Sequence, residues 1–275
     1  MTQWMITGVS SGLGAALARA VLARGDGVAG TVRSAADREA FEALAPDRAR
    51  GFLLDVTDEA ALREAIAAAE AASGGLDVLV NNAGYGLVGA VEEASLAEAR
   101  AQFEVNLFAP LVAIQAVLPF MRARRAGHIV NITSVSGLAT WAGTGVYCAS
   151  KFALEGLTET LAQEVAEIGI RVTNVAPGGL RTNYAGRSLA HARLRLADYD
   201  GLARDASRIL AEHAGSEPGD PAKVAAAILK VVDDPAPPMH LLLGADALGY
   251  AAARIRLLQA EMERWRALSL STGAD

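Results

Sequence analysis

Residues Gln3 to Gly14 read QWMITGVSSGLG, an apolar run that leads directly into three closely spaced glycines. The run predicts a first strand over Gln3–Thr7, and the alanine-rich segment that follows predicts a helix ending near Gly25. Glycine permits positive φ and close approach of a ligand to the backbone, and the helix start offers unpaired N–H groups. A strand, a glycine-rich turn and a helix in this order suit a pyrophosphate. The expected cofactor contacts are Gly8, Ser10, Ser11, Gly12, Leu13 and Gly14.

The rest of the chain alternates between apolar runs and helical segments. This alternation predicts an α/β fold, a doubly wound (Rossmann-like) parallel sheet of about seven strands with helices on both faces. A length of 275 residues, with 52% hydrophobic and 20% charged residues, suits one large core, so we expect a single domain over 1–275. The further strands are expected at 27–32, 49–54, 76–80, 127–132, 170–176 and 239–243.

The end of the second expected strand bears on cofactor choice. Folds that prefer NAD place a carboxylate here for the ribose 2′-hydroxyl, but this chain has Arg33 and Ser34 and no acid until Asp37. A guanidinium can bind a 2′-phosphate in a bidentate way, whereas a carboxylate repels it. We therefore expect NADP(H) to be preferred, with Arg33 as the main contact and Ser34 assisting. NAD(H), with a solvated Arg33, is the alternative.

A second informative stretch, Ser134–Lys151, reads SVSGLATWAGTGVYCASK. Tyr147 and Lys151 are four residues apart and share one helix face. A neighbouring ammonium favours the phenolate and lowers the pKa of a tyrosine from about 10, which makes Tyr147 usable as a general acid/base. Ser134 follows an apolar strand whose carboxyl end is where such sheets hold ligands. A lone Y-x-x-x-K pair is common on helices, so the catalytic interpretation depends on the neighbouring motifs.

Together these motifs resemble those of the short-chain dehydrogenase/reductase family, over roughly Gln3 to Leu243. The resemblance implies a catalytic set of Asn106, Ser134, Tyr147 and Lys151, with the last two also holding the cofactor. It places Asp55 and Val56 at the adenine, and the Asn81-Asn82-Ala83-Gly84 stretch beside the ribose, with Asn81, Ala83 and Gly84 as contacts and Asn82 as a structural residue. The turn after the sixth strand would meet the nicotinamide through Pro177, Gly178, Leu180 and Thr182.

Pro110 gives the expected role of Asn106 a physical basis. Proline has no N–H, so in a helix over 97–124 the carbonyl of Asn106 would lose its partner and could hold a water near Lys151. A kink that serves only packing is the alternative.

The expected activity is reversible, NADPH-dependent reduction of a ketone or aldehyde by hydride transfer, with Tyr147 as the general acid/base. The residues expected to line the substrate are Ser134, Tyr85, Leu138, Trp141, Tyr147 and Tyr184, and this partly aromatic set suggests a lipophilic or aromatic substrate. Residues 183–219 are expected to form a substrate lid, and 246–268 a C-terminal amphipathic helix. The alternatives are alcohol oxidation as the working direction, a non-catalytic NADP-binding regulator, and an epimerase or dehydratase acting on nucleotide sugars.

Composition narrows the remaining classes of partner. A net charge of −6 argues against nucleic acid, and the four histidines show no metal-ligand spacing, so we expect neither nucleic acid nor metal. The single cysteine, Cys148, is compatible with a reducing compartment, and the first strand begins too early for a secretory signal. We expect a cytoplasmic protein that does not bind membranes. The resemblance implies a homodimer, with a tetramer as the alternative.

Overall fold

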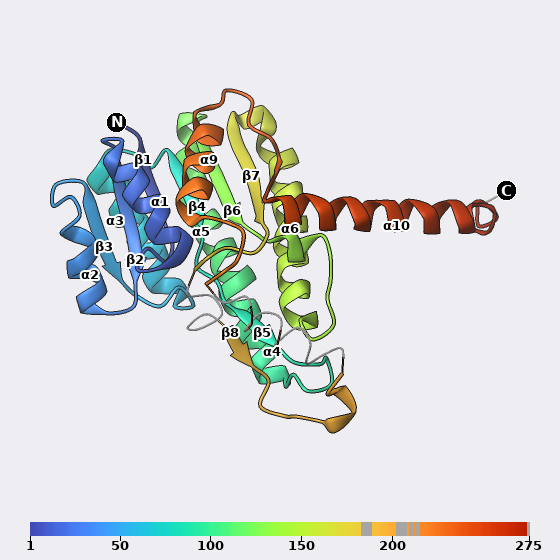
Figure 1. The fold of residues 1–275 in the computed structure, drawn as a ribbon. Helices are drawn as coiled ribbons and strands as arrows, with labels where there is room; N and C mark the ends of the chain where they lie inside the picture. The colour runs from blue at the N-terminus through green and yellow to red at the C-terminus, as the bar shows by residue number, and fades with distance from the viewer. Residues whose placement is uncertain (183–188, 202–207, 209–211, 213–214, 274–275) are drawn as a thin grey trace.

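The computed structural model describes residues 1–182, 189–201, 208, 212 and 215–273 of the chain. Its centre is a seven-stranded sheet in the order β3-β2-β1-β4-β6-β7-β9, in which every neighbouring pair is parallel (Figure 1). The expected doubly wound parallel sheet is therefore confirmed. The strands are β1 (Gln3–Ile6), β2 (Gly27–Val32), β3 (Ala49–Leu53), β4 (Val78–Asn81), β6 (Gly127–Ile132), β7 (Ile170–Pro177) and β9 (His240–Leu243).

Helices cover both faces of this sheet, so its central strands are hydrophobic throughout. One core contains side chains of α1 and α9, which pack side by side, and the other contains side chains of α3, α5 and α6 (Figure 1). Because both faces are covered, β1, β2 and β4 are almost completely buried. The helices are α1 (Gly12–Ala23), α2 (Ala35–Glu42), α3 (Glu59–Ser73), α4 (Leu96–Phe103), α5 (Ala109–Arg124), α6 (Gly145–Val165), α9 (Pro221–Asp233) and α10 (Ala245–Leu270).

The strand order contains one reversal, between β1 and β4. The chain winds outward from β1 through β2 to β3, and then returns to place β4 on the other side of β1. In open parallel sheets the connections diverge at such a point and leave a crevice at the carboxyl ends of the strands. The turns after β1 and β4 therefore border the crevice in which a ligand is expected.

The helix expected over 97–124 is divided into three parts. A π-helical turn over Glu104–Phe108 separates α4 from α5, and the N–H of Ala109 donates to the carbonyl of Glu104 across it. Pro110 follows at once, and such π turns occur often at functional sites. By length and composition the stretch Leu96–Arg124 could cross a membrane, but its α5 part packs into the core through Ala113, Val117 and Met121.

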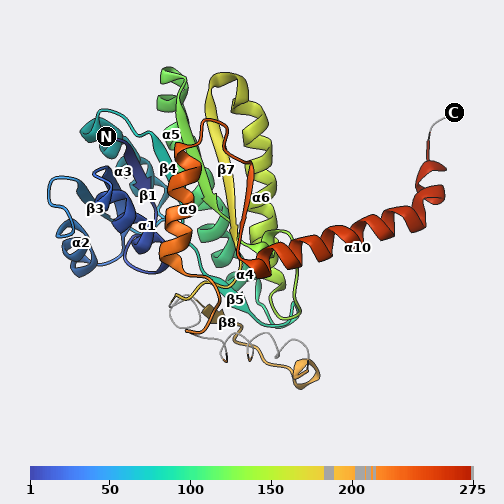
Figure 2. The ribbon, with the colours of Figure 1, turned by 45° about the horizontal axis from the view of Figure 1, so that its top comes forward.

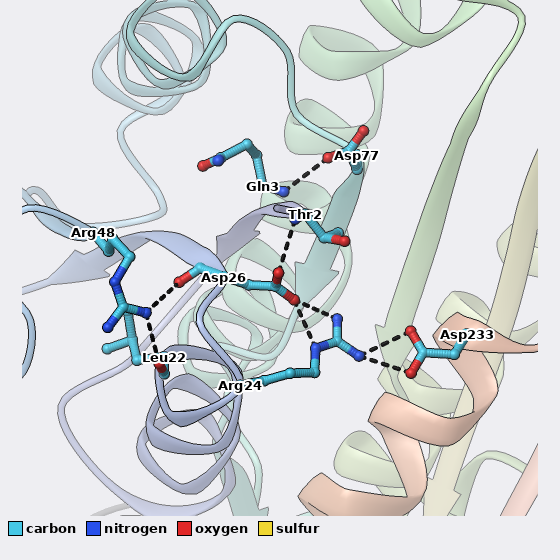
Figure 3. A network of polar contacts seen from close by, with 8 residues as sticks. All are labelled: Thr2, Gln3, Leu22, Arg24, Asp26, Arg48, Asp77 and Asp233. Carbon is cyan, nitrogen blue, oxygen red and sulfur yellow. Dashed lines mark hydrogen bonds and ion pairs between the residues drawn. The ribbon is translucent and has the colours of Figure 1, made fainter.

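A charged network fastens the amino ends of the strands, at the edge opposite the crevice. Arg24 lies at its centre and donates to Asp26 and to both carboxylate oxygens of Asp233 on α9, at 2.8 Å each (Figure 3). Asp26 in turn accepts the N–H of Thr2, and Asp77 accepts the N–H of Gln3. The network joins β1, α1 and α9 and is separate from the site described below.

Two features lie outside the sheet and its helices. A small two-stranded sheet pairs β5 (Gly86–Val88) with β8 (Leu189–His191), which brings part of the expected 183–219 lid against the chain that follows β4. Further along the expected lid, Leu196 and Tyr199 bond Glu93 and Glu92, while 183–188, 202–207, 209–211 and 213–214 lie outside the described residues. The expected C-terminal helix is α10, slightly longer than anticipated, and it projects away from the body (Figure 2).

Candidate active site

The turn after β1 has a shape that side chains other than glycine would disturb. Gly8 and Gly12 adopt positive φ, at +74° and +58°. A Cβ on Gly14 would lie 2.1 Å from the Gly8 carbonyl oxygen and 2.4 Å from Asn82 Nδ2, closer than real Cβ atoms come. Ser11, the N-cap of α1, makes no side-chain capping bond, and Ser10 and Ser11 are exposed. The helix start therefore presents its N–H groups as an anion site would.

Hydroxyl groups beneath this turn hold it in place. Thr31 Oγ1, on β2, accepts the N–H of Gly8 at 2.9 Å. Thr7 Oγ1 accepts the N–H groups of Asn82 and Ala83, at 2.9 and 3.0 Å. The sequence analysis did not identify Thr7 and Thr31 as supports for the turn. A hydroxyl residue at the carboxyl end of a buried strand is the signal that could have revealed them.

Asn81 and Asn82 hold different parts of the structure together. The Asn81 side chain is buried and donates from Nδ2 to Asn131 Oδ1 at 2.8 Å, which ties β4 to β6. A buried amide takes a partner within the protein, so this side chain serves the sheet, and the cofactor contact of Asn81 stays a prediction. Asn82 does have a structural role, but at the glycine turn, where its Nδ2 donates to the carbonyls of Thr7 and Gly8.

Lys151 lies in a buried position between α6 and the end of β6. Only 6% of the residue is exposed, and its Nζ donates to the carbonyl of Ile132 at 2.9 Å. Burial lowers the pKa of Lys151 to about 8, and the carboxylate of Glu155 acts in the opposite direction. A Cβ on Gly84 would lie 3.6 Å from Lys151 Nζ, so this ammonium reaches the stretch that follows β4.

Asn106 supports the same place from the π-helical turn. Its Oδ1 accepts the N–H of Tyr85 at 3.2 Å, and its Nδ2 donates to the carbonyl of Tyr85 and to Ser150 Oγ, at 3.0 Å each. Oδ1 would also lie 3.2 Å from a Cβ on Gly84. The side chain of Asn106 therefore fastens the chain after β4 to α6. The sequence analysis considered only the main-chain carbonyl of this residue and did not predict the role of its side chain.

Ser134 and Tyr147 lie on the two elements that Lys151 connects. Ser134 lies two residues after the end of β6, and its Oγ accepts the N–H of Ser136 at 3.0 Å, which caps the short 3₁₀ turn over 135–137. Tyr147 is partly buried on α6, one turn before Lys151 and on the same face, and its carbonyl accepts the hydroxyl of Ser150 at 2.7 Å. Ser134, Tyr147, Lys151 and Asn106 thus come from three segments that converge after β4 and β6.

At the other end of the crevice, Arg33 and Asp55 lie close enough to interact. Arg33 is exposed at the end of β2, and its charge contributes to lowering the pKa of Asp55, whose main cause is the N–H of Thr57 bonded to the carboxylate. Ser34 has a second role, because its Oγ accepts the N–H of Asp37 as the N-cap of α2 and donates to the Asp37 carboxylate at 2.7 Å. Val56, next to Asp55, is half-buried against the second core.

The turn after β7 lies opposite the glycine turn. A Cβ on Gly12 would lie 3.7 Å from the Thr182 side chain, so the two turns face each other across a short gap. Asp246, in the first turn of α10, accepts the N–H of Gly179 at 2.8 Å, and a Cβ on Gly178 would collide with its carboxylate. Pro177 is buried and Leu180 half-buried. Asp246, a support that the sequence did not reveal, links this turn to α10.

The residues expected at the substrate are only partly gathered. Tyr85 is half-buried next to Asn106, and burial raises the pKa of its phenol. Leu138 is half-buried, and Trp141 makes an edge-on ring contact with Tyr250 of α10, with centroids 5.1 Å apart. Tyr184 lies outside the described residues.

The described residues fit a dinucleotide. The glycine turn leaves room that a Cβ would fill, and the open N-terminus of α1 and the guanidinium after β2 offer hydrogen-bond donors for phosphates. The buried ammonium of Lys151 lies at the opposite end of the crevice. A sequence profile described as short chain dehydrogenase matches residues 3–192. The chain belongs to the short-chain dehydrogenase family. It is therefore an oxidoreductase that acts between alcohol and carbonyl groups.

Relatives of this short-chain dehydrogenase cover almost its whole length. Oxidoreductase BOA17 of Botryotinia fuckeliana is 37% identical over 98% of both chains. A 3-ketodihydrosphingosine reductase of Bacteroides thetaiotaomicron is 36% identical over 87% of both chains. Human retinol dehydrogenase 8 is 36% identical over 86% of this chain and 79% of its own.

Solved structures agree with this assignment and bear on the cofactor. A short-chain dehydrogenase from Streptomyces avermitilis is 40% identical, with a TM-score of 0.93 over 99% of this chain and 100% of its own. A member from Burkholderia phymatum in complex with NAD has a TM-score of 0.83 at 25% identity, covering 94% of this chain and 95% of its own. ElxO with NADP bound has a TM-score of 0.75 at 25% identity, covering 90% and 99%. A nicotinamide cofactor is therefore supported for this short-chain dehydrogenase, and the choice between NAD and NADP is left open.

Proposed function

We propose that this chain is an NADPH-dependent reductase that converts a ketone or aldehyde to an alcohol, and that also catalyses the reverse reaction. The observation that carries the proposal is the position of Lys151. Its buried ammonium lies beside Gly84 and Asn106, one helical turn from Tyr147. It also bonds the carbonyl of Ile132, the last residue of β6, which is followed two residues later by Ser134. A buried cation beside a phenol, at the crevice of a dinucleotide fold, suits proton transfer to a carbonyl oxygen.

In this mechanism Ser134, Tyr147 and Lys151 have different tasks. The nicotinamide supplies the hydride when it is bound. Ser134 and Tyr147 donate hydrogen bonds to the substrate carbonyl oxygen, which fixes its orientation. As negative charge develops on that oxygen, Tyr147 releases its proton to it, and the ammonium of Lys151 stabilises the phenolate that remains. In the oxidative direction the same phenolate accepts the proton of the alcohol.

The preference for NADPH rests on charge at the end of β2. Arg33 is exposed there. Its charge also reaches Asp55, after the end of β3, where it contributes to lowering the pKa of the carboxyl group. A 2′-phosphate would gain a charge-assisted bond from the guanidinium, worth about 1.5–3 kcal/mol. Ser34 would contribute less, because its hydroxyl is engaged in capping α2.

A lipophilic substrate is the second part of the proposal. The names of two relatives refer to retinol and to 3-ketodihydrosphingosine, molecules that each carry a long hydrocarbon part. In this chain, Tyr85, Leu138 and Trp141 supply apolar surface beyond the catalytic residues. Apolar surface of this kind binds substrate through burial and leaves the polar contacts to Ser134 and Tyr147.

We also propose that the protein works as a cytoplasmic homodimer. Ala247 and Ala251 bury the start of α10 against the body, but every described residue from Ile255 onward is exposed (Figure 2). Ile255, Leu258, Met262 and Trp265 follow one another at intervals of three and four residues, the spacing of an apolar helix stripe. Such a stripe suits a second copy of the chain, since its exposure to water is unfavourable. The lone thiol, Cys148, is buried and free, as suits a reducing compartment.

The decisive experiment follows NADPH oxidation with a panel of aliphatic aldehydes, aromatic ketones, steroids and retinal. The wild-type protein should reduce at least one lipophilic carbonyl. Tyr147→Phe should lose about a hundredfold to ten-thousandfold in kcat while NADPH still binds, because general acid catalysis contributes about 10²–10⁴ in rate. A Tyr147→Phe protein that reduces the same carbonyl at the wild-type rate would remove Tyr147 from the mechanism.

A further inference from the structure

The catalytic face of α6 continues beyond Lys151 to two carboxylates. Tyr147, Lys151, Glu155 and Glu159 follow one another at intervals of four residues, so they form one line along the helix. The side chain of Glu155 is 5% exposed and that of Glu159 is 49% exposed. The line therefore runs from the buried site toward solvent.

His240 joins the two carboxylates at the outer end of this line. It is the first residue of β9, and its Nδ1 lies 2.8 Å from Glu155 Oε1 while its Nε2 lies 3.2 Å from Glu159 Oε1. Its side chain is 35% exposed and borders a surface hollow with Glu159, Ala162 and Met239. Solvent can therefore reach the imidazole but not the inner carboxylate.

Glu155 is coupled to groups on both sides. Burial raises the pKa of Glu155, and the hydrogen bond and charge of His240 act against that rise. On its inner side its charge opposes the burial that lowers the pKa of Lys151. The titratable groups that act on Glu155 are His240 and Glu159, and Glu155 in turn acts on Lys151, one turn before it; Thr133, which bonds the carboxylate, is neutral.

We propose that Glu155 and His240 are positioning residues for the reaction: Glu155 is the counter-ion that keeps Lys151 charged, and His240 is the solvent-facing group that keeps Glu155 ionised. A buried ammonium is costly without an opposite charge nearby, and a buried carboxylate is costly without a donor. Along the row from His240 through Glu155 to Lys151, each group therefore stabilises the charge of the next, whereas Glu159 acts against the charge of Glu155. This inference rests on the proposed reductase function, in which the charge of Lys151 stabilises the phenolate of Tyr147.

The first test needs no activity. Histidine NMR resolves the ring nitrogens of all four imidazoles of the chain, and His240 is assigned from the spectrum of His240→Gln. In Glu155→Gln the Nδ1 signal of His240 should move, because Nδ1 loses a carboxylate oxygen at 2.8 Å. Glu164→Gln removes an exposed carboxylate from the same helix and is the matched control, in which the Nδ1 signal should stay in place. An unchanged Nδ1 signal in Glu155→Gln would overturn the pair.

The second test measures kcat for carbonyl reduction between pH 6 and 10. Removing the counter-ion makes Lys151 lose its proton at lower pH, so the alkaline limb of the profile should move down by about one unit in Glu155→Gln. His240→Gln, at a half-exposed position that tolerates a polar side chain, should move the limb in the same direction by less. KM for NADPH should change by less than about twofold in both variants, whereas general damage to the fold would alter kcat and KM at every pH.

The outcomes separate the inference from the function on which it rests. A wild-type protein that reduces no carbonyl removes the reductase proposal, and the Nδ1 signal of His240 still decides whether Glu155 and His240 are paired. An active enzyme whose alkaline limb stays in place in both variants overturns the link to Lys151 alone. In the described part of the chain, Glu155, Glu159 and His240 are also a group that could hold a metal ion. A change in the His240 ring signals on addition of one equivalent of Zn²⁺, with loss of activity on chelation, would replace the counter-ion role with a metal site.

Discussion

Replacing Gly14 by alanine tests how the crevice is built, because the new methyl group has no room. Its Cβ would lie 2.1 Å from the carbonyl oxygen of Gly8 and 2.4 Å from Asn82 Nδ2, so the turn must shift by about an ångström. Forced overpacking costs about 1–3 kcal/mol. The displaced Asn82 amide also loses its bonds to the carbonyls of Thr7 and Gly8, at 2.9 and 3.0 Å, worth about 1 kcal/mol each.

These contributions together predict a loss of about 3–5 kcal/mol, or about 10 °C in Tm for a chain of this size. Thermal unfolding followed by circular dichroism measures the shift, and fluorescence titration measures the accompanying loss in NADPH affinity. The matched control is Gly156→Ala on α6, where no atom lies within 4 Å of the added Cβ. There the better helix propensity of alanine should raise Tm by about 2 °C. A Gly14→Ala protein that melts within 1 °C of the wild type would refute the close contact between the two turns.

Three further substitutions test other parts of the site. Arg33→Asp should lower kcat/KM for NADPH relative to NADH by about a hundredfold, through loss of a charge-assisted bond and gain of repulsion; an unchanged ratio in steady-state kinetics would mean that Arg33 does not read the 2′-phosphate. Lys151→Met should abolish turnover yet stabilise the fold at pH 7 by about 1–2 kcal/mol, because burial lowers the lysine pKa to about 8 and the ammonium therefore costs stability below that pH. The wild-type protein should regain this difference between pH 8 and 10.5, where the unfolded chain binds the proton that the folded chain has released, and urea unfolding at pH 7 and 9.5 that shows no such convergence would contradict it. Trp265→Glu should convert a dimer to a monomer in light scattering without changing the far-ultraviolet spectrum, whereas an intact dimer, or a wild-type protein that pelleted with lipid vesicles, would place the partner of α10 elsewhere.

The destabilising cost of Lys151 also explains why so many contacts surround it. The buried ammonium donates to the carbonyl of Ile132, and the carboxylate of Glu155 lies one turn away on the helix. Asn106 and Ser150 fasten the neighbouring chain to α6, so that the crevice does not relax around the charge. A site that stores an unfavourable charge requires a rigid surrounding to keep it.

Local sequence determined the architecture of this protein. Apolar runs of strand length alternate with helical segments, and such alternation favours a parallel sheet covered on both faces. The seven-stranded sheet could therefore be predicted from the sequence. The positions of Gly8, Gly12 and Gly14, and the four-residue interval between Tyr147 and Lys151, are read from neighbours in the chain. They required no knowledge of distant contacts.

Only the tertiary structure decided which polar side chains face the crevice and which hold the sheet together. Asn81 and Asn82 are adjacent and identical in type, yet one bonds Asn131 within the sheet and the other bonds the turn after β1. His240 lies 85 residues from Glu155, and nothing in either local sequence indicates that they meet. Hydrogen bonds and ion pairs depend on distances of about 3 Å between atoms. Such distances arise only when the winding of the sheet brings remote segments together.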